Sequence, residues 1–146
     1  MAEKIIYDTD PGIDDALGLL LLTASPEIDL LAITVTHGNT SQEKCLNNAL
    51  KLVELTGITK VPVARGAEEP LVKELSVAEE THGEGGLGYA ILPKSLISPC
   101  SELAHDLIIR LVRENPGEVT LLCVGPMTNI ALAFLKAPEI VSKVRR

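Results

Sequence analysis

The sequence predicts an α/β fold, with a Rossmann-like open parallel sheet covered by helices on both faces. Short apolar segments of strand-forming residues alternate with helical segments, in the order β-α-β-α-β-loop-α-β-α. Parallel strands need a crossover connection, which a helix normally supplies. The length of 146 residues is sufficient for one such core. We therefore expect a single domain over residues 1–146.

The first half of the chain contains three expected strands and two expected helices. Lys4–Tyr7 is a short strand-forming run, and the helix expected over Asp14–Thr23 is apolar on nearly all sides, which predicts that it is buried. Ile28–Thr36 is almost continuously apolar, as is typical of a strand covered on both faces. Apolar residues recur at helical spacing over Gln42–Thr56, and Val61–Ala64 forms a third short strand.

The second half begins with a long segment of little periodicity. Ala67–Pro99 is rich in glycine, and we interpret it as a functional loop with at most short helical pieces. Helical periodicity resumes over Ser101–Asn115, and Val119–Val124 is the fourth strand. The last helix is expected over Thr128–Leu135, with a continuation after Pro138.

Composition excludes several classes of function. The net charge of −7 disfavours binding to nucleic-acid backbones or anionic lipid. The apolar runs are too short for a membrane span, and the first residues lack a signal-peptide pattern, so we expect a soluble, cytoplasmic protein. The cysteines Cys45, Cys100 and Cys123 are odd in number and lack CxxC spacing. Neither a disulfide framework nor a structural zinc site is expected.

Four carboxylates surround the turn after the first strand: Asp8, Asp10, Asp14 and Asp15. A helix N-terminus stabilises one or two acids, which explains Asp14 or Asp15. It does not also explain Asp10, since a carboxylate just past a buried strand needs several hydrogen bonds or a cation to remain charged. The two explanations that stay open are a divalent metal and a structural network of caps. Oxygen ligands without His or Cys favour Ca²⁺ or Mg²⁺.

The same turn resembles a known family. Asp8–Ala16, which reads DTDPGIDDA, is similar to the N-terminal signature of the inosine-uridine preferring nucleoside hydrolases. Thr36–Asn39, His82–Gly88 and Gly125–Ala131 resemble further family segments in the same order. The likeness covers essentially the whole chain, and it implies a truncated fold of nucleoside hydrolase type.

The resemblance implies an activity and a cofactor. The activity is calcium-dependent hydrolysis of the N-glycosidic bond of a ribonucleoside, which yields ribose and free base by means of metal-activated water. Asp10, Asp15 and the backbone carbonyl of Val124 would be Ca²⁺ ligands. Asp10 would also be the general base.

The resemblance also implies three substrate contacts. Asp14 and Asn39 would hold ribose hydroxyls, and His82 would lie near the nucleobase. Each residue also has an ordinary structural explanation. Asn39 follows a glycine and is a common turn former, and His82 is compatible with an exposed loop position. Thr128 and Asn129 are interpreted mainly as the start of a helix.

Family members are longer than this chain, which resembles only their N-terminal portion. The remainder supplies another aspartate ligand, a histidine and a ribose-binding segment, so we expect the isolated chain to be inactive or feeble. A further strand is expected from Val144, and a bare sheet edge or face would favour a homodimer. Two alternatives stay open: a non-catalytic fragment that binds Ca²⁺ or self-associates, and a metal-dependent phosphohydrolase. The sequence near Asp8 and Asp10 offers that second chemistry no Lys or Arg.

Overall fold

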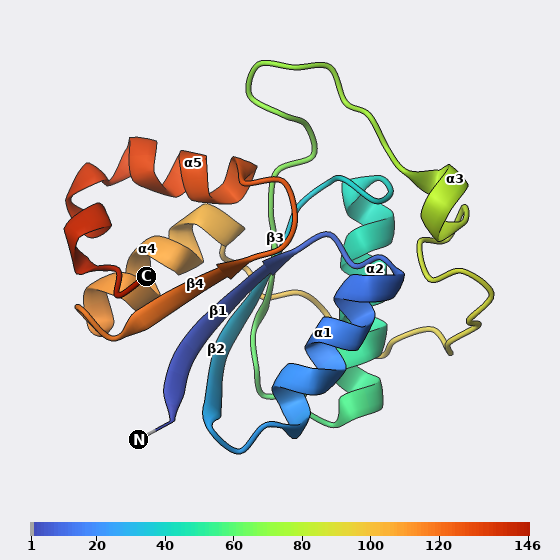
Figure 1. The fold of residues 1–146 in the computed structure, drawn as a ribbon, viewed down its shortest axis with the longest axis horizontal. Coiled ribbons are helices and arrows are strands. Elements are labelled where there is room, and N and C mark those ends of the chain that lie inside the picture. The colour runs from blue at the N-terminus through green and yellow to red at the C-terminus, as the bar shows by residue number, and fades with distance from the viewer. Residues whose placement is uncertain (1) are drawn as a thin grey trace.

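The computed structural model describes residues 2–146. Within these residues, four parallel strands form one sheet in the order β3-β2-β1-β4 (Figure 1). The strands are β1 (Glu3–Thr9), β2 (Ile28–Val35), β3 (Val63–Arg65) and β4 (Val119–Cys123). The helices are α1 (Ile13–Ala24), α2 (Gln42–Thr56), α3 (Glu79–His82), α4 (Ala104–Glu114), α5 (Thr128–Lys136) and the 3₁₀ helix η1 (Pro138–Lys143). The predicted open parallel sheet is confirmed.

Helices cover both faces of the sheet, as predicted. Successive side chains of a strand point to opposite faces, and Tyr7 and Ile33 accordingly pack with α1 and α2. Ile6 and Ala32 point to the other face, where they pack with α4, α5 and η1. The sheet thus has an apolar layer on each side, which explains the nearly continuous apolar sequence of β2.

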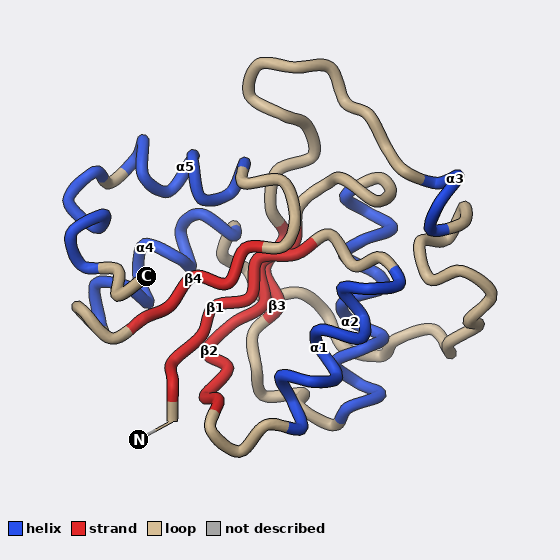
Figure 2. Tube along the Cα trace, viewed as in Figure 1, coloured by secondary structure: helices blue, strands red, loops and turns tan. Residues whose placement is uncertain are grey.

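The strands all end at one edge of the sheet. Asp8 is in register with Cys123 of β4 and with Thr34 of β2, and Val35 pairs with Arg65 of β3. The loops that follow these strands therefore meet above the same edge, where open α/β sheets bind their ligands. Figure 2 shows the long loop between β3 and α4, interrupted by α3.

Most predicted boundaries are within two residues of the observed ones, and three of the differences have a clear physical cause. β3 begins at Val63, two residues later than predicted, because Pro62 has no N–H to donate to a sheet. α4 begins only after Leu103, whose backbone is extended. The continuation after Pro138 is a 3₁₀ helix, because the backbone of Ala137 leaves the helical region.

The prediction that α1 is buried is wrong for the described residues. Leu19 and Leu22 face the sheet and are buried, whereas Leu17 and Leu21 are 63% and 69% exposed. Periodicity shows which sides of a helix are apolar, but it does not show which of those sides another element covers.

The last residues run beside β4. The Arg145 N–H donates to the Val119 carbonyl, and the Leu121 N–H donates to the Arg146 carbonyl, both at 2.8 Å. The partners advance together along both segments, so the chain returns parallel to β4. This is the direction expected of a further strand after a right-handed crossover.

The three cysteines are free, with Cys45 buried and Cys100 and Cys123 partly buried. Among residues 2–146, every helix is too short or too polar to cross a lipid bilayer.

Candidate active site

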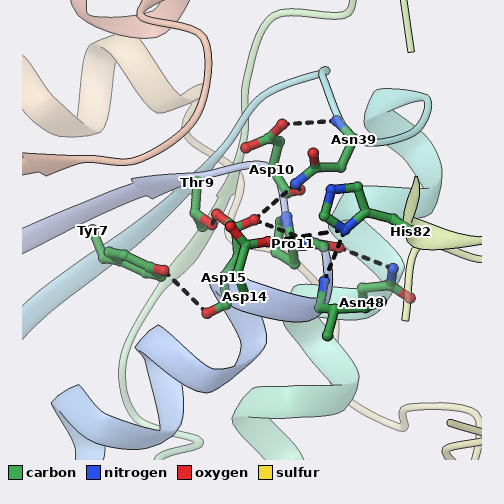
Figure 3. Close-up of polar contacts among 11 residues, drawn as sticks. Tyr7, Thr9, Asp10, Pro11, Asp14, Asp15, Asn39, Asn48 and His82 are labelled. Atoms are coloured by element: carbon green, nitrogen blue, oxygen red, sulfur yellow. Dashed lines mark hydrogen bonds and ion pairs between the residues drawn. The ribbon is translucent and has the colours of Figure 1, made fainter. Parts of the chain in front are cut away.

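Asp15 closes the turn between β1 and α1. Its carboxylate accepts hydrogen bonds from the Thr9 hydroxyl at 2.8 Å and from the Gly12 N–H at 3.1 Å. The buried Tyr7 hydroxyl donates to the Asp15 carbonyl at 3.0 Å. The acid expected at the helix N-terminus is therefore Asp15, and these bonds fix the path of the chain through the turn (Figure 3).

Asp10 lies in a narrow slot at the end of β1 and is 4% exposed. Its Oδ2 accepts the Asn39 N–H at 2.7 Å, whereas no other residue of 2–146 donates a hydrogen bond to its Oδ1. A Cβ added to Gly38 would overlap Oδ2, and one added to Gly125 would lie 2.7 Å from Oδ1. The slot thus exists because two backbone segments approach the carboxylate where only glycine fits.

Asn39 joins the two buried acids. Its side-chain Nδ2 donates to the Asp10 carbonyl at 2.9 Å and to Asp15 Oδ2 at 2.8 Å. Together with the backbone bond to Asp10, these contacts place Asn39 inside the acidic turn, as Figure 3 shows. No donor among the described residues reaches Asn39 Oδ1, which stays available to a ligand hydroxyl.

Electrostatics at the turn favour a bound cation. Burial, followed by the negative charge of Asp15, raises the pKa of Asp10 to about 7, and the Asn39 N–H bond only partly opposes this effect. Two neighbouring carboxylates are therefore desolvated with little compensating positive charge. A cation beside them would stabilise their ionised forms.

Asp8 has a structural role that the sequence does not reveal. It is fully buried, and its Oδ2 accepts the Thr34 hydroxyl at 2.6 Å and the Asn129 side-chain N–H at 2.9 Å. Asn129 Oδ1 in turn accepts the Ala67 N–H at 2.8 Å. Asp8 and Asn129 thus tie β1, β2, α5 and the loop after β3 together below the site. A helix-start pattern gave no sign of this buried amide.

Replacement of Asp8 by asparagine should reduce the pH dependence of folding. Burial raises the pKa of Asp8 from 3.8 to about 6, so the folded state binds the proton more tightly than the unfolded state. The contribution of Asp8 to the free energy of unfolding is then greatest below pH 4. As the pH rises through 6, up to about 3 kcal/mol of this contribution is lost. Urea unfolding in calcium-free buffer from pH 4 to 8 should show a larger loss of stability for the wild type than for Asp8→Asn, which keeps only the loss due to the raised pKa of Asp10. Equal slopes would contradict it.

Asp14 and His82 lie on the outer side of the turn. The Asp14 side chain is 83% exposed, and its Oδ1 is 3.9 Å from His82 Nδ1. His82 is only 13% exposed, and its Nδ1 accepts the Ile13 N–H at 3.2 Å. His82 is therefore no free loop side chain, since it satisfies one of the unpaired N–H groups at the start of α1.

Val124 is the first residue beyond β4. Its N–H donates to the Asp8 carbonyl at 2.9 Å, and the following Gly125 lies against Asp10 Oδ1. The Val124 carbonyl accepts no hydrogen bond from residues 2–146. The structure thus brings the backbone of Val124 to the slot that holds Asp10.

The donor atoms suit a hard cation. The Asp10 and Asp15 carboxylates and the Val124 carbonyl offer only oxygen, which suits Ca²⁺ or Mg²⁺ better than zinc. The four acids do not form one cluster, since Asp8 points into the core and Asp14 into solvent. Within residues 2–146 no three His, Cys, Asp or Glu side chains gather as a metal site, so any such site needs backbone and solvent oxygens. No Lys or Arg there bonds to Asp8, Asp10 or Asp15, which disfavours the phosphohydrolase alternative.

Comparison with known proteins shows which family the chain matches. The family model of the inosine-uridine preferring nucleoside hydrolases matches residues 5–146. The pyrimidine-specific ribonucleoside hydrolase RihA of Escherichia coli O139:H28 is 43% identical over 146 residues, which are 100% of this chain and 47% of that protein. The chain thus spans about half the length of the curated relatives it matches.

Solved structures agree with the sequence match. The plant nucleoside hydrolase PpNRh1 superposes with a TM-score of 0.91 at 39% identity, over 99% of this chain and 46% of that one. The purine-preferring ribonucleoside hydrolase of Gardnerella vaginalis gives 0.91 at 37% identity, over 97% of this chain and 46% of that one. The chain, with its acidic turn at the carboxyl edge of a parallel sheet, belongs to the inosine-uridine preferring nucleoside hydrolase family.

Proposed function

We propose that residues 1–146 form a single α/β domain equivalent to the N-terminal part of a calcium-dependent nucleoside N-ribohydrolase. The observation that carries the proposal is the buried Asp10 carboxylate, whose Oδ1 accepts no hydrogen bond from any other residue of 2–146, while Asp15 and the Val124 backbone lie beside it. The relatives' names support the reaction class, since they are ribonucleoside hydrolases.

Asp10, Asp15 and the Val124 carbonyl would hold the Ca²⁺ ion. These donors are fewer than the six to eight oxygens that Ca²⁺ usually takes, so water and ribose hydroxyls would complete its coordination. Bound Ca²⁺ would acidify and orient a water molecule.

The side chains of the turn supply the rest of the chemistry. Asp10 Oδ1 would accept a proton as the water oxygen bonds to C1′ of the ribose and the bond from C1′ to the base nitrogen breaks. The ribosyl group gains positive charge in this step, which the carboxylates of Asp10 and Asp15 stabilise. Asn39 Oδ1 and the exposed Asp14 carboxylate would accept hydrogen bonds from ribose hydroxyls.

The base would lie on the His82 side of the turn. His82 is the last residue of α3, and its Nδ1 lies 3.9 Å from Asp14 Oδ1. The names of the relatives differ in the base that they specify, since one relative is called pyrimidine-specific and another purine-preferring. We therefore propose a ribonucleoside as the substrate class and leave the base unassigned.

The chain alone should be at most feebly active. It spans 47% of its relative RihA, and leaving-group protonation from the rest of such a protein would be lost. General acid catalysis is typically worth about 10²–10⁴ in rate. The homodimer and the cytoplasmic location stay predictions.

A sensitive assay of ribose release tests the proposed function. Uridine and inosine are each incubated with the protein in Ca²⁺ and in EDTA, and ribose and free base are quantified against an Asp10→Asn control. We expect slow release that requires Ca²⁺ and disappears in the variant. Release that survives in EDTA or in Asp10→Asn would contradict the proposed roles, as would no release together with no calcium effect on the melting temperature.

A further inference from the structure

One buried amide connects the acidic turn to the glycine-rich loop after α3. Asn48, in the middle of α2, is 4% exposed. Its Nδ2 donates to the Pro11 carbonyl at 3.2 Å and to the Gly85 carbonyl at 2.8 Å. Figure 3 shows Asn48 beside Pro11 and His82. Both N–H groups of this side chain are thus used, one on each segment.

The chemistry of the contact requires an amide. Pro11 precedes the N-cap of α1, so its carbonyl has no partner within the helix, and Asn48 supplies the missing donor. An aspartate at position 48 would have the same shape but would present oxygens to two carbonyl oxygens. Both hydrogen bonds would be lost, and the contacts would become repulsive.

The loop backbone is fitted closely to this amide. Gly86 is buried and has a φ of +86°, and a Cβ there would lie 2.9 Å from Asn48 Nδ2. The neighbouring Gly85 has open space around its Cβ position. A glycine is therefore needed at position 86, which approaches Asn48, and not at position 85.

The loop fitted in this way carries His82. The Gly88 N–H donates to the His82 carbonyl at 2.7 Å, and His82 Nδ1 accepts the Ile13 N–H. The turn that holds Asp10 and Asp15 is thus joined to the loop at two places, at Pro11 through Asn48 and at Ile13 through His82.

We infer that Asn48 is a positioning residue that holds the His82 loop against the acidic turn, and so sets the distance between the base side and the ribose side of the bound nucleoside. The loop-holding part rests on the contacts above. The ligand part rests on the proposed function. Asn48 itself touches neither the reacting atoms nor the proposed Ca²⁺ ligands.

Amide hydrogen exchange in the ligand-free chain tests the loop-holding part. The Gly88 amide is the probe, and sheet amides of β1 report global stability. Asn48→Asp should speed Gly88 exchange at least about tenfold, the effect of losing two ordinary hydrogen bonds. Asn47→Asp is the matched control, because Asn47 is the exposed neighbour on the same helix, and it should change exchange less than about twofold. A folded Asn48→Asp protein with unchanged Gly88 exchange overturns the inference.

If Asn48→Asp fails to fold, a second pair of variants tests whether Asn48 holds the loop. Gly86→Ala forces the loop away from Asn48, whereas Gly85→Ala alters a glycine with free space beside it. We expect faster Gly88 exchange in Gly86→Ala and wild-type exchange in Gly85→Ala. Equal exchange in the two proteins overturns the inference.

Uridine binding by calorimetry in Ca²⁺ tests the ligand part. Asn48→Asp should raise the uridine dissociation constant about tenfold while the Ca²⁺ dissociation constant changes less than about twofold. Unchanged uridine affinity with a freed loop would overturn the ligand part alone. If the wild type binds no nucleoside at all, the proposed function fails, and the exchange data still decide whether Asn48 holds the loop.

Discussion

Replacement of Asp10 by asparagine is expected to abolish calcium-dependent stabilisation. The wild type should gain about 2.7 kcal/mol at a Ca²⁺ concentration of 100 times the dissociation constant, or roughly 5–10 °C in melting temperature. In Asp10→Asn the amide oxygen can still accept the Asn39 N–H, but an N–H₂ group then faces the position of the cation. Without calcium the variant should be at least as stable as the wild type, because a buried charge beside Asp15 is removed.

Asp14→Asn is the matched control for this prediction. It makes the same change of charge four residues away, but the Asp14 side chain is 83% exposed, with its Oδ1 3.9 Å from His82 Nδ1. Its calcium response should equal that of the wild type. Thermal melts of the three proteins in Ca²⁺ and in EDTA give the comparison, and an undiminished response of Asp10→Asn would show that the ion binds elsewhere.

Replacement of Gly38 by alanine is expected to destabilise the chain and to weaken calcium binding together. Gly38 has a φ of +151°, and an added Cβ would overlap Asp10 Oδ2 and lie 2.9 Å from Asp10 Cγ and from Pro126 Cδ. The strained backbone and the displaced carboxylate should cost about 2–4 kcal/mol. Because Asp10 must move, the calcium response should fall as well.

Gly57→Ala separates the backbone effect from the steric one. Gly57 caps the end of α2 with a φ of +76°, and no atom of residues 2–146 lies within 4 Å of its Cβ position. Its replacement should cost only about 1 kcal/mol and leave the calcium response intact. Urea unfolding of both variants measures these costs. If the two substitutions cost the same, Gly38 does not shape the slot for Asp10.

The fold was predictable because its signals are local. The continuous apolar sequence of β2 indicates a strand covered on both faces, and helical spacing over 42–56 gives the bounds of α2. The start of β3 was missed because Pro62 removes a donor that only the sheet register reveals. The exposure of Leu17 and Leu21 was missed because the covering of a helix depends on elements far away in the sequence.

The site was predictable where it follows a motif. The acidic turn and Asn39 meet at one edge because the strands are parallel, and the structure places them in contact. Asn48 and Asn129 were missed because a single Asn within a helix has no distinguishing pattern. Their partners, Gly85 and Asp8, lie 37 and 121 residues away, and only the folded chain brings them together.

A crystal structure grown in calcium chloride would show whether the acidic turn holds the ion. We expect one ion at about 2.3–2.6 Å from oxygens of Asp10, Asp15 and the Val124 carbonyl, with solvent at the remaining positions. The same carboxylates in the same slot without an ion, at a calcium concentration that saturates any thermal response, would contradict it.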